Sequence, residues 1–136
     1  SYGGRWNWPG LSRAVYGTFD PEAALAEANS HAHRLGVVLA DNLPRSMEAF
    51  RVDLSEVLDL TTFPIQAQLR LPPDLFSVPW ERAISEGWET LTHAIGRAAF
   101  EERLEAIIVP CAPKPEMKNL IVFRENLKPR STITYY

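Results

Sequence analysis

Three side chains in this sequence differ from their surroundings in a way that points to chemistry. Arg5 is the one charged residue of an opening segment rich in glycine and proline. Glu27 lies on the small-residue side of a predicted helix, and Cys111 comes directly after an apolar stretch and a proline. A guanidinium, a carboxylate and a thiol are groups that proteins use to bind anions, stabilise cations and attack electrophiles. Each of them also has an ordinary structural interpretation, so each is weighed in turn.

Arg5 has two interpretations. An arginine in a loop is most often a solvated surface charge. It can also bind a phosphate through two parallel hydrogen bonds, because its planar guanidinium carries five donors. The preceding Gly3 and Gly4 have no side chains, so we expect them to let the backbone approach such a ligand.

Glu27 falls on one face of a predicted helix. That face carries Ala24, Glu27, Ala28, His31 and Leu35 at spacings of three and four residues. One interpretation is an exposed glutamate paired with His31 one turn later. The other is a carboxylate that binds sugar hydroxyls and stabilises positive charge on a ribose carbon. The periodicity alone leaves both open.

Cys111 is the single cysteine, so it cannot form an internal disulfide. Structurally it can be a small buried hydrophobic residue. As a nucleophile it would need a base, and the histidines available are His31, His33 and His93. A metal site is not predicted, because His31 and His33 are two residues apart on a helix and do not share a face.

Composition narrows the class of protein. The chain has 136 residues, 46% hydrophobic, with 14 Lys and Arg against 17 Asp and Glu, which gives a formal charge of −3. This length and balance predict one globular domain. The absence of a basic run argues against direct nucleic-acid binding. The sequence contains no apolar run of about 18 residues, so no membrane span is predicted. The lone cysteine suits a reducing compartment, so we expect a cytoplasmic protein.

The local patterns predict an α+β domain with a mixed sheet. Asp20 and Pro21 are typical of a helix start, and Gly36 of a helix end. We expect Pro110 to end a strand. The predicted elements are a loop over 2–10, helices over 21–35 and 88–103, a turn or short helix ending at 60, proline-rich loops near 64, 72–73 and 79, and strands at 14–17, 37–40, 49–54, 106–109, 119–123 and 131–136.

Several segments, in order along almost the whole chain, resemble the RES domain family. This family is named for its Arg, Glu and Ser residues and contains toxins of bacterial toxin–antitoxin pairs. The segments that carry the resemblance are Gly3-Gly4-Arg5-Trp6-Asn7, Ala14-Val15-Tyr16, residues 20–27, residues 52–61, Gly96-Arg97-Ala98, residues 106–112 and residues 119–123.

The resemblance implies a fold related to ADP-ribosyltransferases and chemistry on NAD. Family members cleave the bond between nicotinamide and ribose, with phosphate or water as acceptor, or transfer ADP-ribose to a protein. Carried over to this chain, Arg5 would hold the NAD phosphates, Tyr16 would stack on nicotinamide or its ribose, and Glu27 would orient the ribose. We also expect Asn7 among the NAD-binding residues, and Cys111 beside Arg5 and Glu27 among the catalytic ones.

Two departures from the family keep alternatives open. Cys111 stands where the family usually has Ser, and a thiol is the poorer hydrogen-bond donor. The chain begins at Ser1, almost at the first motif, so an N-terminal segment can be missing from the domain expected over 1–136. The main expectation is an NAD-degrading toxin, an NAD phosphorylase or transferase, with NAD and phosphate as ligands, no metal, and a cognate antitoxin as partner. The alternatives are a catalytically impaired module that binds NAD or the antitoxin, and a Cys-His hydrolase.

Overall fold

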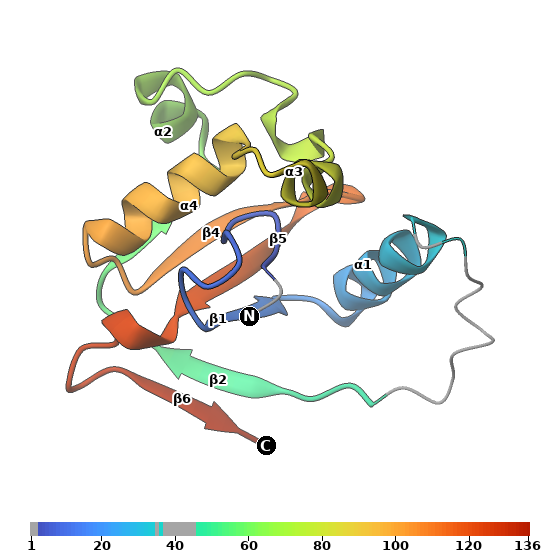
Figure 1. Ribbon diagram of the computed structural model, residues 1–136. Helices are drawn as coiled ribbons and strands as arrows, with labels where there is room; N and C mark the ends of the chain where they lie inside the picture. Colours follow the sequence, from blue (N-terminus) through green and yellow to red (C-terminus); the bar gives the residue numbers. More distant parts are fainter. Residues whose placement is uncertain (1–2, 35, 37–45) are drawn as a thin grey trace.

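A mixed four-stranded sheet forms the centre of the molecule (Figure 1). The computed structural model describes residues 3–34, 36 and 46–136. The sheet has the order β1-β5-β4-β3, in which β5 is antiparallel to both neighbours and β3 is parallel to β4. The strands are β1 (Ala14–Thr18), β3 (Val57–Asp59), β4 (Ala106–Cys111) and β5 (Lys114–Phe123). The α+β class with a mixed sheet, predicted from the sequence, is confirmed.

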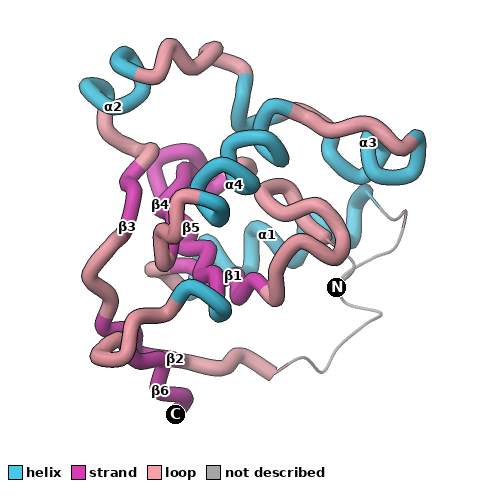
Figure 2. Tube along the Cα trace, turned by 60° about the vertical axis from the view of Figure 1, so that its left-hand side comes forward, coloured by secondary structure: helices cyan, strands magenta, loops and turns pink. Residues whose placement is uncertain are grey.

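Two further strands form a separate antiparallel ribbon. They are β2 (Phe50–Asp53) and β6 (Thr132–Tyr135), and they correspond to the strands predicted at 49–54 and 131–136. Both views place this ribbon on the side of the molecule away from the helices α2 (Phe63–Gln68) and α4 (Leu91–Glu101) (Figure 1 and Figure 2). The predicted strand at 37–40 lies outside the described residues.

The two faces of the central sheet bury different apolar clusters. Alternate residues of a strand point to opposite faces, so Ile107 and Ile121 belong to one cluster and Ala106 and Val122 to the other. The first cluster includes Trp6 from the opening loop and packs against the helix α4. The second packs against residues of the ribbon. The sheet is therefore covered on both faces.

The helix predicted at 21–35 is present as α1 (Pro21–Arg34). The Asp20 carboxylate accepts a hydrogen bond from the Glu22 amide at 2.7 Å, which caps the first turn as expected. Gly36 has φ +72°, and its amide donates to the carbonyl of His33 at 3.0 Å. A left-handed glycine at this position is a common helix end.

The second predicted helix begins later than expected. It is α4 (Leu91–Glu101), and its start is fixed by Thr90, whose hydroxyl accepts from the His93 amide at 3.1 Å. His93 Nδ1 accepts from the Thr90 amide, so Nε2 carries the proton that it donates to the carbonyl of Gly4 at 2.8 Å. Burial lowers the pKa of His93, which keeps the ring neutral. This histidine ties the opening loop to α4.

Two of the prolines predicted to lie in loops are instead at the starts of short helices. Pro64 lies in the first turn of a short helix, α2 (Phe63–Gln68), and Pro79 is the N-cap of another, α3 (Trp80–Glu86). The 3-10 helix η2 (Leu75–Ser77) lies between them and η3 (Arg124–Asn126) follows β5. Proline suits the start of a helix because its missing amide would have no partner there. These segments are therefore short helices where the sequence predicted loops.

Two strand predictions also need correction. Residues 57–59 form the strand β3, whereas the sequence predicted the end of a turn or short helix there. This strand is held by parallel pairing with β4, in which Val57 lies opposite Ala106. Pro110 does not end β4. The strand continues to Cys111 through a register shift between these two residues, which is where a proline can be tolerated in a sheet.

Candidate functional site

A pocket of about 460 Å³ opens between the opening loop, β1, α1 and the ends of β4 and β5. It is called the Arg5–Glu27 pocket here, because both of these predicted residues line it. Tyr16 from β1, His31 from α1 and Trp80 from the start of α3 complete its polar and aromatic wall. The fold thus brings together three of the five predicted site residues, Arg5, Tyr16 and Glu27, from three separate segments.

The predicted face of α1 is the helical wall of this pocket. Ala24, Glu27, Ala28 and His31 all line it, while Leu35 lies outside the described residues. Glu27 is half-buried, and its Oε1 accepts from Asn119 Nδ2 at 2.8 Å. The carboxylate is therefore held by the sheet, and the alternative of a surface pair with His31 is not what the structure describes.

Asn119 is a site residue that the sequence analysis missed. It lies on β5, lines the pocket, and fixes the Glu27 carboxylate through its amide nitrogen. Its Oδ1 is buried, and none of the described residues donates a hydrogen bond to it. Asn119 is a polar residue at the start of the apolar run 119–123, and this is the signal in the sequence that could have identified it. The run by itself predicts only a strand.

Cys111 supports the same carboxylate. Its thiol is fully buried and donates to Glu27 Oε1 at 3.4 Å. Burial raises the pKa of the thiol to about 11, and the negative charge of Glu27 adds to this effect. An activated cysteine nucleophile needs the opposite shift. The structure therefore opposes the Cys-His hydrolase alternative and places Cys111 behind Glu27, outside the lining of the Arg5–Glu27 pocket.

Arg5 connects the opening loop to the segment before α3. Its Nη1 donates to the carbonyl of Val78 at 2.5 Å, two residues ahead of Trp80. This contact spans 73 residues of sequence and brings Trp80 to the pocket wall. The guanidinium is half-buried, so its charge is partly shielded from water while it still lines the pocket.

Tyr16 is held by the opening loop through its hydroxyl. The hydroxyl donates to Asn7 Oδ1 at 2.5 Å and accepts from the Trp6 amide at 3.2 Å. The residue as a whole is 44% exposed, so the ring faces the pocket while the hydroxyl end is enclosed. This enclosure raises the pKa of the Tyr16 phenol. Tyr16 is thus a neutral aromatic surface at any ordinary pH.

The structure shows what the residues of the opening loop pack against. Asn7 is buried, 2% exposed, and lies behind Tyr16 instead of on the pocket wall, so it orients Tyr16. A Cβ on Gly4 would lie 2.6 Å from the Tyr16 hydroxyl, and one on Gly3 would lie 2.8 Å from Pro9. The missing side chains thus leave room for Tyr16 and Pro9, and both glycines also line the Arg5–Glu27 pocket.

The described residues, 3–34, 36 and 46–136, contain no group of three or more His, Cys, Asp or Glu side chains that could hold a metal ion. Among the same residues, no helix is both long and apolar enough to cross a membrane.

Comparison with known proteins places this arrangement in a family. A model of the RES domain matches residues 1–134, which is nearly the entire sequence. The chain belongs to the RES domain family. The chain matches no curated protein sequence.

The fold of this RES domain is also similar to a solved structure. A chain in the crystal structure of the M. tuberculosis MbcT–MbcA toxin–antitoxin complex superposes with a TM-score of 0.73 at 23% sequence identity. The match covers 98% of the RES domain described here and 68% of that chain. At this identity the likeness establishes the fold. The RES family assignment rests on the sequence match.

Proposed function

We propose that this RES domain is an NAD-consuming toxin that breaks the bond between nicotinamide and ribose. The observation that carries the proposal is the Glu27 carboxylate, held by Asn119 and Cys111 in the same pocket as Arg5 and Tyr16. The family assignment supports it, and so does a structural neighbour that comes from a toxin–antitoxin complex.

The chemistry fits a dissociative displacement. The bond from C1″ of the nicotinamide ribose to the nicotinamide nitrogen breaks, and its electron pair neutralises the pyridinium, so the leaving group needs no acid. Positive charge then develops on the ribose. A fixed carboxylate such as Glu27 stabilises that charge without having to reorganise. An oxygen of phosphate, water or a protein side chain forms the new bond to C1″, and a water or hydroxyl oxygen loses its proton to solvent.

The remaining side chains suit the rest of the substrate. The Arg5 guanidinium would bind the pyrophosphate, which a single well-placed arginine can do in an otherwise acidic protein. Tyr16 would stack on the nicotinamide ring. Glu27 Oε2 and Asn119 Oδ1 receive no hydrogen bond from the described residues, and ribose hydroxyls are donors that would satisfy both.

A cognate antitoxin is the proposed protein partner. We expect it to be encoded beside the toxin and to block access to the Arg5–Glu27 pocket. Co-expression with the neighbouring gene should relieve growth arrest. The complex, purified intact, should bind NAD more weakly than the RES domain alone.

The main experiment follows nicotinamide release by NMR, with NAD in phosphate buffer and in a phosphate-free buffer. Release that needs phosphate and yields ADP-ribose 1″-phosphate would identify a phosphorylase. Release in both buffers would identify a glycohydrolase or a transferase. A folded protein that binds NAD by calorimetry but releases nothing would contradict the enzyme and favour the impaired binding module, for which the weak thiol donor at Cys111 gives a reason.

Glu27→Gln tests the role of the carboxylate in the same assay. We expect the rate to fall by about 10²–10³, as for the loss of other electrostatic stabilisers. Glu22→Gln is the matched control, because Glu22 lies on the same helix but is exposed and paired with Lys114. Equal rates for Glu27→Gln and the parent would refute the assignment.

A further inference from the structure

The backbone on either side of Arg5 is held by two side chains from other elements. The carbonyl of Gly4 belongs to the peptide group before Arg5, and it accepts from His93 Nε2 at 2.8 Å. The amide of Trp6 belongs to the peptide group after Arg5, and it donates to the Tyr16 hydroxyl at 3.2 Å. Peptide groups are planar, so fixing both of them fixes the direction in which the Arg5 side chain leaves the loop.

His93 is bound on its other sides as well. The residue is fully buried in the first turn of α4, and its Nδ1 accepts from the Thr90 amide at 3.2 Å. The Trp8 ring packs against it edge to face, with 5.4 Å between the ring centroids. Gly96, one turn further along α4, has no side chain, so the backbone that follows Arg5 packs directly against the helix. The opening loop thus contacts α4 at two points, one on each side of Arg5.

The two hydrogen bonds of the His93 ring require its neutral form with the proton on Nε2. Nδ1 must carry no proton to accept from the Thr90 amide, and Nε2 must carry one to donate to Gly4. A protonated ring has an N–H on both nitrogens, so Nδ1 would direct a donor at the Thr90 amide. The buried site would also have to hold a positive charge. Protonation of His93 is therefore incompatible with the contacts that hold the opening loop.

Two charged groups among the described residues face the ring and act in opposite directions. Arg5, from the opening loop, disfavours a second positive charge, and Glu89, from the segment before α4, favours it. The Glu89 carboxylate is already paired with Arg97, whose Nε donates to it at 2.9 Å. Burial is the largest effect, and it lowers the pKa of His93 below the ordinary value of 6.5. The ring is therefore neutral at pH 7 and becomes charged only in acid.

We propose that His93 is a positioning residue for Arg5, and that protonation of its ring in acid releases the opening loop. His93 is not part of the lining of the Arg5–Glu27 pocket, so it acts through the backbone before Arg5. Tyr16 holds the peptide group on the other side, and its enclosure raises the pKa of the phenol, so Tyr16 keeps its proton throughout this range. The inference rests on the proposed function in taking NAD as the ligand of Arg5, and it adds an acid-sensitive control of that site.

The first test follows the loop itself and needs no ligand. In ¹⁵N-labelled protein, NMR reports the charge and tautomer of the His93 ring between pH 7.5 and pH 4.5, together with the backbone amides of residues 4–7. The ring should be the neutral Nε2–H tautomer at pH 7.5. As it becomes charged, the loop amides should shift with the same midpoint and exchange faster with water. Loop signals that stay constant while the ring titrates, or a ring that stays neutral down to pH 4.5, would overturn the release.

Glutamine at position 93 separates the hydrogen bonds from the charge. Its Oε1 can accept from the Thr90 amide and its Nε2 can donate to Gly4, as expected for the glutamine of a capping box, but it does not titrate. Calorimetry with NAD should therefore give the same Kd for His93→Gln and the parent at pH 7.5. The Kd of the parent should rise about twofold at the midpoint of the ring titration and about tenfold one pH unit below it, in proportion to the loss of neutral ring. The Kd of His93→Gln should stay level.

Two further variants complete the comparison. His93→Leu keeps apolar bulk but makes neither hydrogen bond, so its Kd for NAD should already be raised about tenfold at pH 7.5. In the nicotinamide assay this loss should appear in KM more than in kcat, because Arg5 is assigned to a part of NAD that does not react. His33→Gln is the matched control, since His33 is exposed on α1 and does not line the pocket. If His93→Leu does not fold, the pH profile of His93→Gln decides alone.

The outcomes separate the inference from the proposed function. His31 lines the pocket and also titrates in acid, but it is present in both the parent and His93→Gln, so its effect is common to the two. If both proteins lose affinity for NAD equally in acid, His93 is not the group responsible, even when nicotinamide is released. If the loop amides follow the His93 ring but NAD does not bind at any pH, the positioning stands and the proposed function fails.

Discussion

Two glutamates in this domain show how the same side chain can serve folding or a site. Glu105, just before β4, is fully buried, and its Oε1 accepts from the Ser55 amide and hydroxyl and the Glu56 amide at 2.8–2.9 Å, while Oε2 accepts from the Lys128 amide at 3.1 Å. Glu27 is half-buried and binds donors only through Oε1 among the described residues.

The difference is visible in the charge state of Glu105. Burial alone would raise the pKa of this carboxyl, but hydrogen bonds from Ser131, Lys128, Glu56 and Ser55 outweigh it and lower the pKa to about 2. Glu105 uses its hydrogen-bonding capacity to join the segments before β3, before β4 and before β6. No described residue donates to Glu27 Oε2, which leaves that oxygen available to the proposed ligand. A carboxylate that the fold does not fully satisfy is therefore the better candidate for function.

Glu105→Gln should give the largest effect on stability. The amide keeps the size of the side chain but directs an N–H group at donors, so some of them lose their acceptor inside the protein. We expect the free energy of unfolding to fall by about 1.5–3 kcal/mol, the usual value of a hydrogen bond to a charged group. Urea denaturation measures this. Glu27→Gln should change stability much less, and an equal loss in both variants would remove the distinction between the two glutamates.

Acid should act through the same residue. The pKa of Glu105 is lower in the folded protein than its ordinary value of 4.5, so its contribution to stability is complete above pH 4.5 and is lost as the pH falls toward 2. Urea midpoints between pH 6 and pH 3 should therefore fall more steeply for the parent than for Glu105→Gln. Parallel curves would show that this carboxylate is not held as described.

Cys111 tests the support of Glu27. Removing the thiol donor in Cys111→Ala should slow nicotinamide release by about 2- to 12-fold, which corresponds to about 0.5–1.5 kcal/mol, because a thiol is a weak donor even to a carboxylate. Cys111→Ser should be at least as active as the parent, because a hydroxyl is the stronger donor. A serine variant as slow as the alanine variant would mean that the thiol acts through packing alone.

The smallest effect is expected at an exposed glutamate. Glu22 pairs with Lys114 at the surface beside the first turn of α1. Lys114→Ala should lower the urea midpoint only slightly, since exposed ion pairs are screened by water. Adding 0.5 M salt to the parent should remove most of the difference between the two proteins. A larger loss would show that this pair helps to hold α1 against the hairpin of β4 and β5.

The sequence predicted those elements whose formation depends on residues close together in the chain. The α1 helix followed from Asp20, Pro21 and Gly36, and its pocket face followed from the spacing of Ala24, Glu27, Ala28 and His31. In contrast, β3 exists because of its pairing with β4, which lies almost 50 residues later. Three residues carry too little pattern to reveal such a strand.

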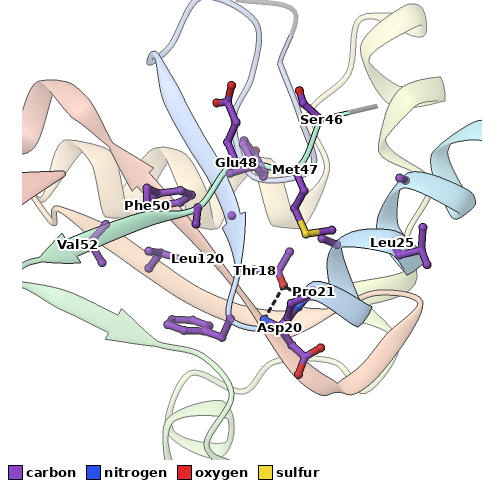
Figure 3. A pocket seen from close by; sticks show the side chains of 16 residues that line it. Thr18, Asp20, Pro21, Leu25, Ser46, Met47, Glu48, Phe50, Val52 and Leu120 are labelled. Atoms are coloured by element: carbon purple, nitrogen blue, oxygen red, sulfur yellow. Dashed lines mark hydrogen bonds between the residues drawn. The ribbon is translucent and has the colours of Figure 1, made fainter. Parts of the chain in front are cut away.

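The parts of the site that were missed depend on contacts between distant segments. Asn119 meets Glu27 across 92 residues, and the Val78 carbonyl meets Arg5 across 73. Asn7 was predicted in the correct loop, but only the fold shows that it lies behind Tyr16. A cavity bounded by β1, α1 and the segment 46–50 (Figure 3) could not be predicted either, because none of these segments is unusual in composition.

Gly96 illustrates how far the site's requirements extend. A Cβ at this position on α4 would lie 1.7 Å from the backbone oxygen of Trp6, next to Arg5. Even alanine would thus force the opening loop away from α4, although Gly96 does not line the Arg5–Glu27 pocket. In a survey of all single substitutions, position 96 should tolerate change as poorly as Glu27. The positions that tolerate no substitution in this domain would therefore include residues that support the site from behind as well as those that line it.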